Sequence, residues 1–179
     1  MRALTRHEDP LSEAANKVAL LLAGNTPFYP LYLWFILGRA GWPWLLLTAL
    51  STPFFAATLW LARRHCLGAR AWLCACASLN TAWVAWLLGP PAGVALFFLP
   101  CLVLAVLVLR AREFAARAPL TALPFLLYFG LPWLPPSPAG ITHAAYASLF
   151  RLNAFSVALL SVVLPYLLGA ARGEGLSRR

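Results

Sequence analysis

Long apolar stretches, separated by short arginine-containing segments, constrain this chain more than any other feature of its sequence. A helix needs roughly 20 apolar residues to cross a hydrocarbon layer about 30 Å thick. Of the 179 residues, 62% are hydrophobic and only 11% are charged, whereas roughly a quarter are charged in a typical globular protein. Because so few polar groups cannot cover a surface that faces water, we expect lipid to surround the chain.

The apolar stretches predict an all-α fold, a polytopic membrane protein with one bundle of six transmembrane helices. The predicted spans are residues 17–38, 42–62, 69–89, 91–110, 119–134 and 148–169. The fifth is short unless its flanks extend it, and the last is expected to belong to a helix that begins near Thr142. The transmembrane domain then covers residues 17–170. It lies between an N-terminal segment, 1–16, and a tail, 171–179, that are both expected to be cytoplasmic.

The basic residues orient the predicted bundle, because arginine and lysine concentrate on the cytoplasmic side of a membrane. Twelve of the fourteen fall in the N-terminal segment, in the loops after spans two and four, and in the tail. They are Arg2, Arg6, Lys17, Arg63, Arg64, Arg70, Arg110, Arg112, Arg117, Arg172, Arg178 and Arg179. Arg39 is expected in an outer loop and Arg151 at the outer boundary. Both termini are therefore predicted to be cytoplasmic, and the composition favours the inner membrane of a bacterium.

Several functions are disfavoured by what the sequence lacks. The charge of +9 is dispersed in small groups, whereas nucleic-acid-binding proteins gather basic residues on one face, so no nucleic-acid partner is expected. The sequence has no His-Glu-x-x-His, Gly-x-Ser-x-Gly or aspartate-rich motif. We therefore predict no catalytic residue, no metal site and no cofactor. No Asp, Glu or Lys lies well within a span, which disfavours proton- or cation-coupled transport.

Two polar patterns are expected at the cytoplasmic ends of helices. Asp9 followed by Pro10 predicts a helix N-cap and a first-turn proline. Glu113 and Arg117 have the i,i+4 spacing of an ion pair on a solvated helical extension of span four.

The first candidate ligand-binding position is the segment around Asn25 and Thr26 in the middle of span one. Pro27 and Pro30 lack backbone N–H groups, so they are expected to leave the carbonyls of Ala23 and Thr26 free. Such a break must face protein or a polar cavity, and transporters bind substrates at broken helices near the membrane midplane. The alternative is a structural kink satisfied by neighbouring groups.

The second candidate is Asn80 in span three. Small residues at helical spacing lie beside it and would let another helix approach closely; they are Cys74, Ser78, Ala82 and Ala85. Span three is therefore predicted to lie at the centre of the bundle. Asn80 is expected either to form an interhelical hydrogen bond or to contact a ligand, and other membrane proteins could pack against the same span.

The third candidate is the start of span six, with Tyr146, Arg151 and Asn153. Arg151 is expected at the outer interface, where an arginine can extend its charged end to water or to lipid phosphate. The alternative is an outward-facing mouth in which Arg151 meets an anionic headgroup or substrate.

These features suggest three functions. The first is a module that binds, transports or senses an apolar or lipid-like small molecule, with membrane lipid as its surroundings. The second is a structural or assembly subunit of a larger membrane complex. The third, an enzyme that modifies lipid, has the least support because no catalytic motif accompanies it.

Overall fold

The computed structural model describes residues 5–38, 44–135, 137 and 141–177, with side chains as far as Ala171. Arg2, Arg39, Arg178 and Arg179 lie outside the described residues, as does the beginning of the second predicted span.

The secondary structure of the described ranges is helical, which confirms the predicted all-α class. The α-helices are α2 (Pro10–Asn25), α3 (Tyr29–Leu37), α4 (Thr52–Ala62), α5 (Cys66–Leu88), α6 (Phe98–Val108), α7 (Phe114–Gly130) and α8 (His143–Ser177). The 3-10 helices are η1 (Thr26–Phe28), η2 (Trp44–Ala49), η3 (Pro90–Ala92), η4 (Val94–Phe97), η5 (Ala111–Glu113) and η6 (Leu131–Trp133).

Five helical stretches of the described chain are long and apolar enough to cross a membrane, as their length and composition show. They are Pro10–Leu37, Trp44–Ala62, Cys66–Leu88, Ala111–Trp133 and His143–Ala171. The fifth predicted span is thus longer than 119–134, and α8 begins next to Thr142 as predicted.

The fourth predicted span, 91–110, corresponds to a shorter apolar helix, Val94–Val108. Its beginning is delayed because η3 forms a separate turn and Gly93 follows it with a φ of 74°. A Cβ on Gly93 would lie 2.7 Å from Cδ2 of Phe150, so glycine also permits the close approach of α8. The helix ends at Val108 because Leu109 has an extended backbone.

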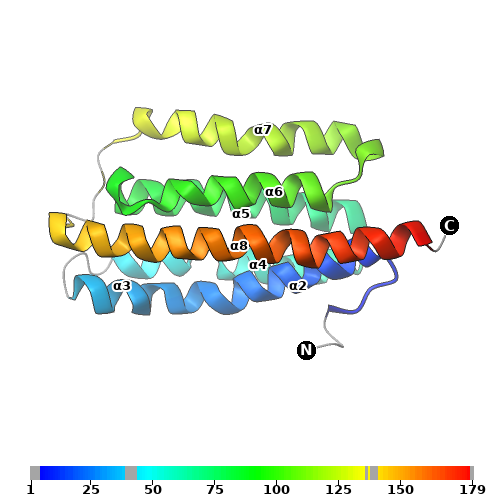
Figure 1. The fold of residues 1–179 in the computed structure, drawn as a ribbon, viewed down its shortest axis with the longest axis horizontal. Helices are drawn as coiled ribbons and strands as arrows, with labels where there is room; N and C mark the ends of the chain where they lie inside the picture. Colours follow the sequence, from blue (N-terminus) through cyan, green and yellow to red (C-terminus); the bar gives the residue numbers. More distant parts are fainter. Residues whose placement is uncertain (1–4, 39–43, 136, 138–140, 178–179) are drawn as a thin grey trace.

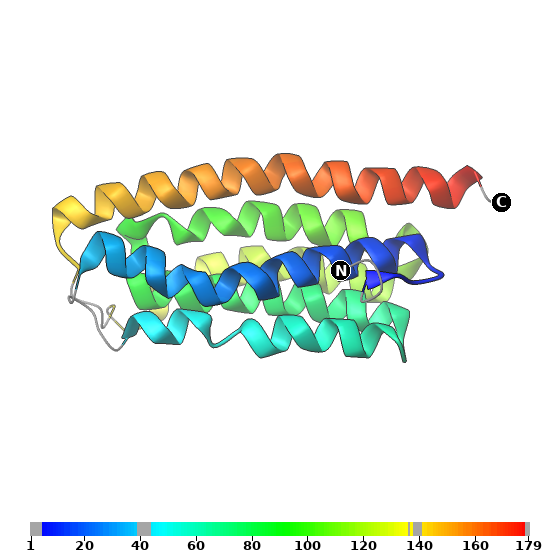
Figure 2. The same ribbon diagram turned by 90° about the horizontal axis from the view of Figure 1, so that it is seen from below.

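The helices lie lengthwise in one bundle (Figures 1 and 2). Helix α5 packs against α2, α4, α6 and α7, and α8 packs against α2, α3 and α6. The central place predicted for span three is therefore confirmed. Three of its four small residues, Cys74, Ser78 and Ala85, are buried inside the bundle, where they allow these neighbours to approach.

The beginning of α2, the α4–α5 connection, the α6–α7 connection and the end of α8 lie at the same end of the bundle (Figure 1). At this end Asp9 caps α2, since its carboxylate accepts the N–H of Ser12 at 3.3 Å. This contact confirms the predicted N-cap.

Two buried apolar clusters hold the bundle together. One lies toward the end where α2 begins and includes Val18, Leu73 and Leu168. The other lies toward the opposite end and includes Leu33 and Leu149. The space between the two clusters is incompletely filled, and this incomplete packing creates the candidate site.

Candidate functional site

A cavity of about 400 Å³ lies in the middle of the bundle, where the two apolar clusters meet. Its walls come from α2, η1, α3, η2, α4, α5, η4, α6 and α8. The cavity brings together three of the six predicted site residues, Asn25, Thr26 and Asn80. Asn80 lies more than fifty positions after the other two in the sequence.

The break in span one forms part of the wall. Helix α2 ends at Asn25, the 3-10 helix η1 follows, and α3 begins at Tyr29. The Thr26 hydroxyl donates to the carbonyl of Leu22 at 2.6 Å, and the carbonyl of Thr26 accepts the N–H of Tyr29. The prediction that Pro30 leaves the Thr26 carbonyl free is therefore wrong, because the tighter 3-10 turn supplies a partner three residues along.

A second break, which the sequence analysis did not predict, lies beside the first. Helix η2 contacts both η1 and α3, and a turn separates it from α4. Its carbonyls are satisfied by side chains: the Thr48 hydroxyl donates to Leu45 at 2.6 Å, and the indole N–H of Trp83 donates to Leu47 at 2.9 Å. Thr48 and the nearby Pro53 are the sequence signals from which this break could have been predicted.

Asn80 lines the cavity and carries a polar atom without a partner in the described chain. Its Oδ1 is buried and has no hydrogen-bond partner among the described residues. Its neighbour Thr81 donates its hydroxyl to the carbonyl of Ala77 at 2.9 Å, one turn earlier in α5. Within the described chain Asn80 thus makes no interhelical hydrogen bond, and its Oδ1 stays unpaired beside the cavity.

The cavity opens toward the side of the bundle. Several wall residues are also exposed on the outer surface: Leu21, Asn25 and Tyr32 belong to the α2–α3 segment, and Phe155 and Leu159 belong to α8. These two segments lie side by side (Figure 1). Since all five residues lie within apolar helices, the opening faces the region that lipid would occupy.

The remaining predicted residues, Tyr146, Arg151 and Asn153, do not line the cavity. Asn153 is fully buried: its Nδ2 donates to the carbonyl of Ala92 at 2.8 Å, and its Oδ1 accepts the hydroxyl of Tyr29 at 3.0 Å. Because Tyr29 is a wall residue, Asn153 supports the cavity from behind.

Tyr146 and Arg151 lie in the first turns of α8. The Tyr146 hydroxyl donates to the carbonyl of Leu88 at 3.2 Å and so joins α8 to α5. The Arg151 side chain is exposed. Their predicted ligand role stays a prediction, separate from the cavity.

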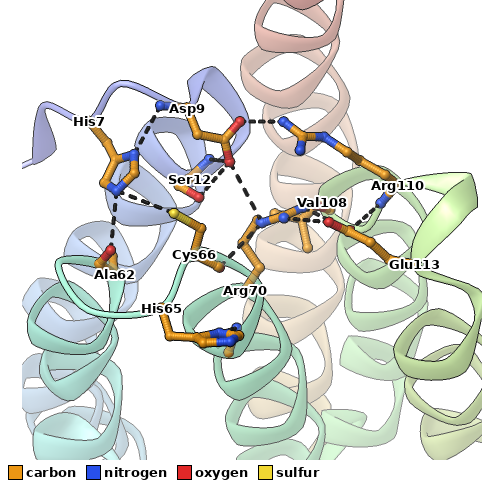
Figure 3. Close-up of polar contacts among 11 residues, drawn as sticks. His7, Asp9, Ser12, Ala62, His65, Cys66, Arg70, Val108, Arg110 and Glu113 are labelled. Carbon is orange, nitrogen blue, oxygen red and sulfur yellow. Dashed lines mark hydrogen bonds and ion pairs between the residues drawn. The ribbon is translucent and has the colours of Figure 1, made fainter.

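A buried ionic cluster at the α2 end of the bundle was missed by sequence reasoning (Figure 3). Arg70 is only 2% exposed, and its two terminal nitrogens donate to the Glu113 carboxylate at 2.6 and 3.0 Å. One of these nitrogens also donates to the carbonyl of Val108 at 2.9 Å. Asp9 pairs with Arg110 and lies 3.9 Å from Arg70 Nε. The cluster therefore ties the residues before α2 to α5 and to the α6–α7 connection.

The predicted pair between Glu113 and Arg117 is wrong, because Glu113 turns inward to Arg70 and accepts the N–H of Arg110 at 2.7 Å. The carboxylate is 11% exposed, so it is largely removed from solvent rather than part of a solvated surface.

His7 lies at the edge of this cluster, near the thiol of Cys66 (Figure 3). Its Nδ1 accepts the N–H of Asp9 at 3.0 Å, so in the neutral ring Nε2 carries the proton. Nε2 lies 3.1 Å from the carbonyl of Ala62 and 3.6 Å from Cys66 Sγ. In this tautomer His7 donates to Ala62 and cannot take a proton from the thiol, which disfavours nucleophilic catalysis by Cys66.

Within the described residues, no group of three or more His, Cys, Asp or Glu side chains is placed to hold a metal ion. Comparison with known proteins finds no matching family, no matching curated protein and no matching solved structure. The class is therefore defined by the fold and the cavity: an all-helical chain with five apolar helices of membrane-crossing length and a mostly apolar cavity among them.

Proposed function

We propose that this protein binds an apolar or lipid-like small molecule in the central cavity, and either transports that molecule or senses it. The observation that carries the proposal is the buried, unpartnered Oδ1 of Asn80 beside a mostly apolar cavity. Ligand sites typically have volumes of roughly 300–1,000 Å³, apolar walls and a few convergent polar groups, and this cavity of about 400 Å³ has all three properties.

The proposal includes a position in the membrane. We infer six spans, with Val94–Val108 as the short fourth span, and cytoplasmic N- and C-termini in the inner membrane of a bacterium. The positive-inside rule supports this orientation, because the end of the bundle where α2 begins carries Arg63, Arg64 and Arg110 in its connections and Arg70 in the first turns of α5. A reporter fused to the C-terminus should be active only in the cytoplasm. Activity of the reporter in the periplasm would contradict the proposed orientation.

Ligand binding is tested by filling the cavity. Ala77 is a buried wall residue of α5, so Ala77→Phe would occupy the space that a ligand needs. Ala122 is an exposed residue of α7, which does not line the cavity, so Ala122→Phe adds the same side chain outside it.

The readout is native mass spectrometry of the full-length chain released from mild detergent. We expect a bound small molecule or lipid on the wild type and on Ala122→Phe, and a substantially lower occupancy on Ala77→Phe. Equal occupancy on all three proteins would overturn the proposal. A stoichiometric protein partner without a small-molecule adduct would instead favour the assembly-subunit alternative.

A further inference from the structure

The walls of the cavity indicate the charge of its ligand. Among the described residues that line it, none is Asp, Glu, Lys, Arg or His. A charged group brought into such surroundings loses its hydration and gains no counter-charge, which is unfavourable. The cavity is therefore suited to a neutral molecule.

The hydrogen bonds of the wall residues indicate the polarity of that molecule. The hydroxyls of Thr26, Thr48 and Thr81 donate to backbone carbonyls, and the hydroxyl of Tyr29 donates to Asn153. The hydroxyl oxygens of Thr26, Thr48 and Tyr29 can still accept a hydrogen bond, as can Oδ1 of Asn80. The Thr81 oxygen already lies 3.5 Å from Sγ of Cys101, its second hydrogen-bond partner. A ligand that donates a hydrogen bond therefore matches these acceptors.

Asn80 further restricts the polar group that the ligand can carry. Its carbonyl needs a donor, but rotation of the amide by half a turn would present its NH₂ group, which needs an acceptor. A hydroxyl group both donates and accepts, so an alcohol satisfies the amide in either orientation. A simple hydrocarbon would leave the buried Oδ1 unpaired, which is unfavourable.

The volume limits how much of a ligand the cavity can enclose. A group the size of a water molecule occupies roughly 30 Å³ in a liquid, so a cavity of about 400 Å³ holds about thirteen such groups. A whole phospholipid is far larger than this space.

The position of the opening indicates the route of access. Leu21 and Asn25 on one side and Phe155 and Leu159 on the other belong to the cavity wall and to the outer surface of apolar helices. A molecule that enters between α2–α3 and α8 would come from the hydrocarbon layer and not from water.

Building on the proposed function, we propose that the cavity binds a neutral, membrane-soluble alcohol of about thirteen non-hydrogen atoms. The alcohol enters from the side, between α2–α3 and α8, and its hydroxyl pairs with the amide of Asn80. Its hydrocarbon part fills the apolar remainder of the cavity.

The ligand class is tested with three probes that share one chain length: 1-dodecanol, dodecane and dodecanoate. Each is titrated, at matched concentrations in the membrane, into full-length protein in lipid nanodiscs, and the rise in melting temperature gives an apparent affinity. We expect dodecanol to bind about tenfold more tightly than dodecane, which corresponds to one hydrogen bond of about 1.4 kcal/mol. Dodecanoate should not raise the melting temperature.

The variant Asn80→Leu should remove the advantage of the alcohol, so that dodecanol and dodecane bind this variant with affinities within twofold of each other. Equal binding of dodecanol and dodecane to the wild type, with both lost in Ala77→Phe, would overturn the alcohol assignment and leave the proposed function standing. Binding that Ala77→Phe does not reduce would overturn both, since the ligand would then lie elsewhere.

The route is tested by a bulky residue at the opening. Leu159→Trp narrows it, whereas Val162→Trp adds the same side chain to an exposed position of α8 that does not line the cavity. We expect dodecanol transfer from donor vesicles to be at least several-fold slower for Leu159→Trp than for Val162→Trp. Equal transfer rates would overturn lateral access.

Discussion

Arg70 and Glu113 form a bidentate ion pair with nitrogen–oxygen distances of 2.6 and 3.0 Å, although 43 positions separate them in the chain. Arg70 lies in the first turns of α5, and Glu113 ends η5, just before α7. Because the guanidinium also donates to the carbonyls of Val108 and Cys66, it joins the beginnings of two helices to the end of a third. The pair therefore fixes how α5, α6 and α7 meet.

Removing Arg70 should destabilise the protein strongly. Truncating one partner of a buried ion pair leaves the other charge uncompensated, at a cost of roughly 3–5 kcal/mol. For a chain of this size that corresponds to a melting temperature lower by about 6–20 °C. The expected order of stability in detergent, from highest to lowest, is wild type, then Arg70→Met with Glu113→Leu, then Arg70→Met alone.

Arg112→Met, at an exposed position of η5, is the control and should change the stability little. A single variant as stable as the double one would contradict the ionic explanation.

Acid should weaken the same end of the bundle through Asp9. Burial raises the pKa of the Asp9 carboxyl, but the hydrogen bond from Ser12 and the charges of Arg110 and Arg70 outweigh burial and leave the pKa below its ordinary value of 3.8. A carboxylate whose pKa is lower in the folded state stabilises the fold above the unfolded pKa, and this stability is lost as the pH falls through the folded pKa.

The difference in melting temperature between wild type and Asp9→Asn should therefore be constant from about pH 8 to pH 5 and shrink below about pH 4. Glu8→Gln, an exposed neighbour, serves as the control and should retain the wild-type loss of stability in acid. A difference that already shrinks near pH 7 would assign the acid sensitivity to another group.

The ionic cluster shows which part of the structure local sequence patterns could not predict. Spacing along one helix suggested Arg117 as the partner of Glu113, because i,i+4 neighbours meet on any helix. The actual partner, Arg70, belongs to another helix, and only tertiary packing brings the two together. Asp9 was predictable as an N-cap because capping is local, but its pairing with Arg110 was not.

Asn153 should contribute to stability through its two hydrogen bonds. Asn153→Leu would leave the Tyr29 hydroxyl and the Ala92 carbonyl without their partner, and interhelical hydrogen bonds in membrane proteins contribute about 0.6–2 kcal/mol each. We expect a melting temperature lower by about 2–16 °C. Combined with Tyr29→Phe, the two effects should be less than additive, because both variants remove the same bond. Ser156→Ala removes a bond within α8 only, so it should show no such coupling.

The polar residues of the cavity were easier to predict than the cavity itself. Few polar side chains lie inside the apolar stretches, so Asn25, Thr26 and Asn80 stood out from the sequence alone. The cavity depends on how completely two clusters fill the space between α2, α5 and α8, and no local pattern encodes that volume. Asn153 illustrates the same limit, since its sequence context could not reveal that Tyr29 and Ala92 already satisfy it.

Straightening span one should increase stability and reduce ligand binding together. In a helix interior proline is about 3 kcal/mol less favourable than alanine, and the 3-10 turn at Thr26–Phe28 recovers part of this difference. Pro27→Ala with Pro30→Ala restores two N–H donors, so an α-helix can continue through Asn25 and Thr26 and move this part of the cavity wall. We expect a melting temperature higher by about 2–6 °C, together with a several-fold weaker affinity for dodecanol.

Pro165→Ala provides the matched control, because Pro165 also lies inside a helix but does not line the cavity. It should raise the melting temperature without weakening dodecanol binding. Comparing the double variant with Pro165→Ala distinguishes two roles for the break in span one. If the double variant binds dodecanol as tightly as the wild type, the prolines are only a kink that the protein tolerates. If affinity falls while stability rises, the less stable, broken helix exists because it shapes the binding cavity.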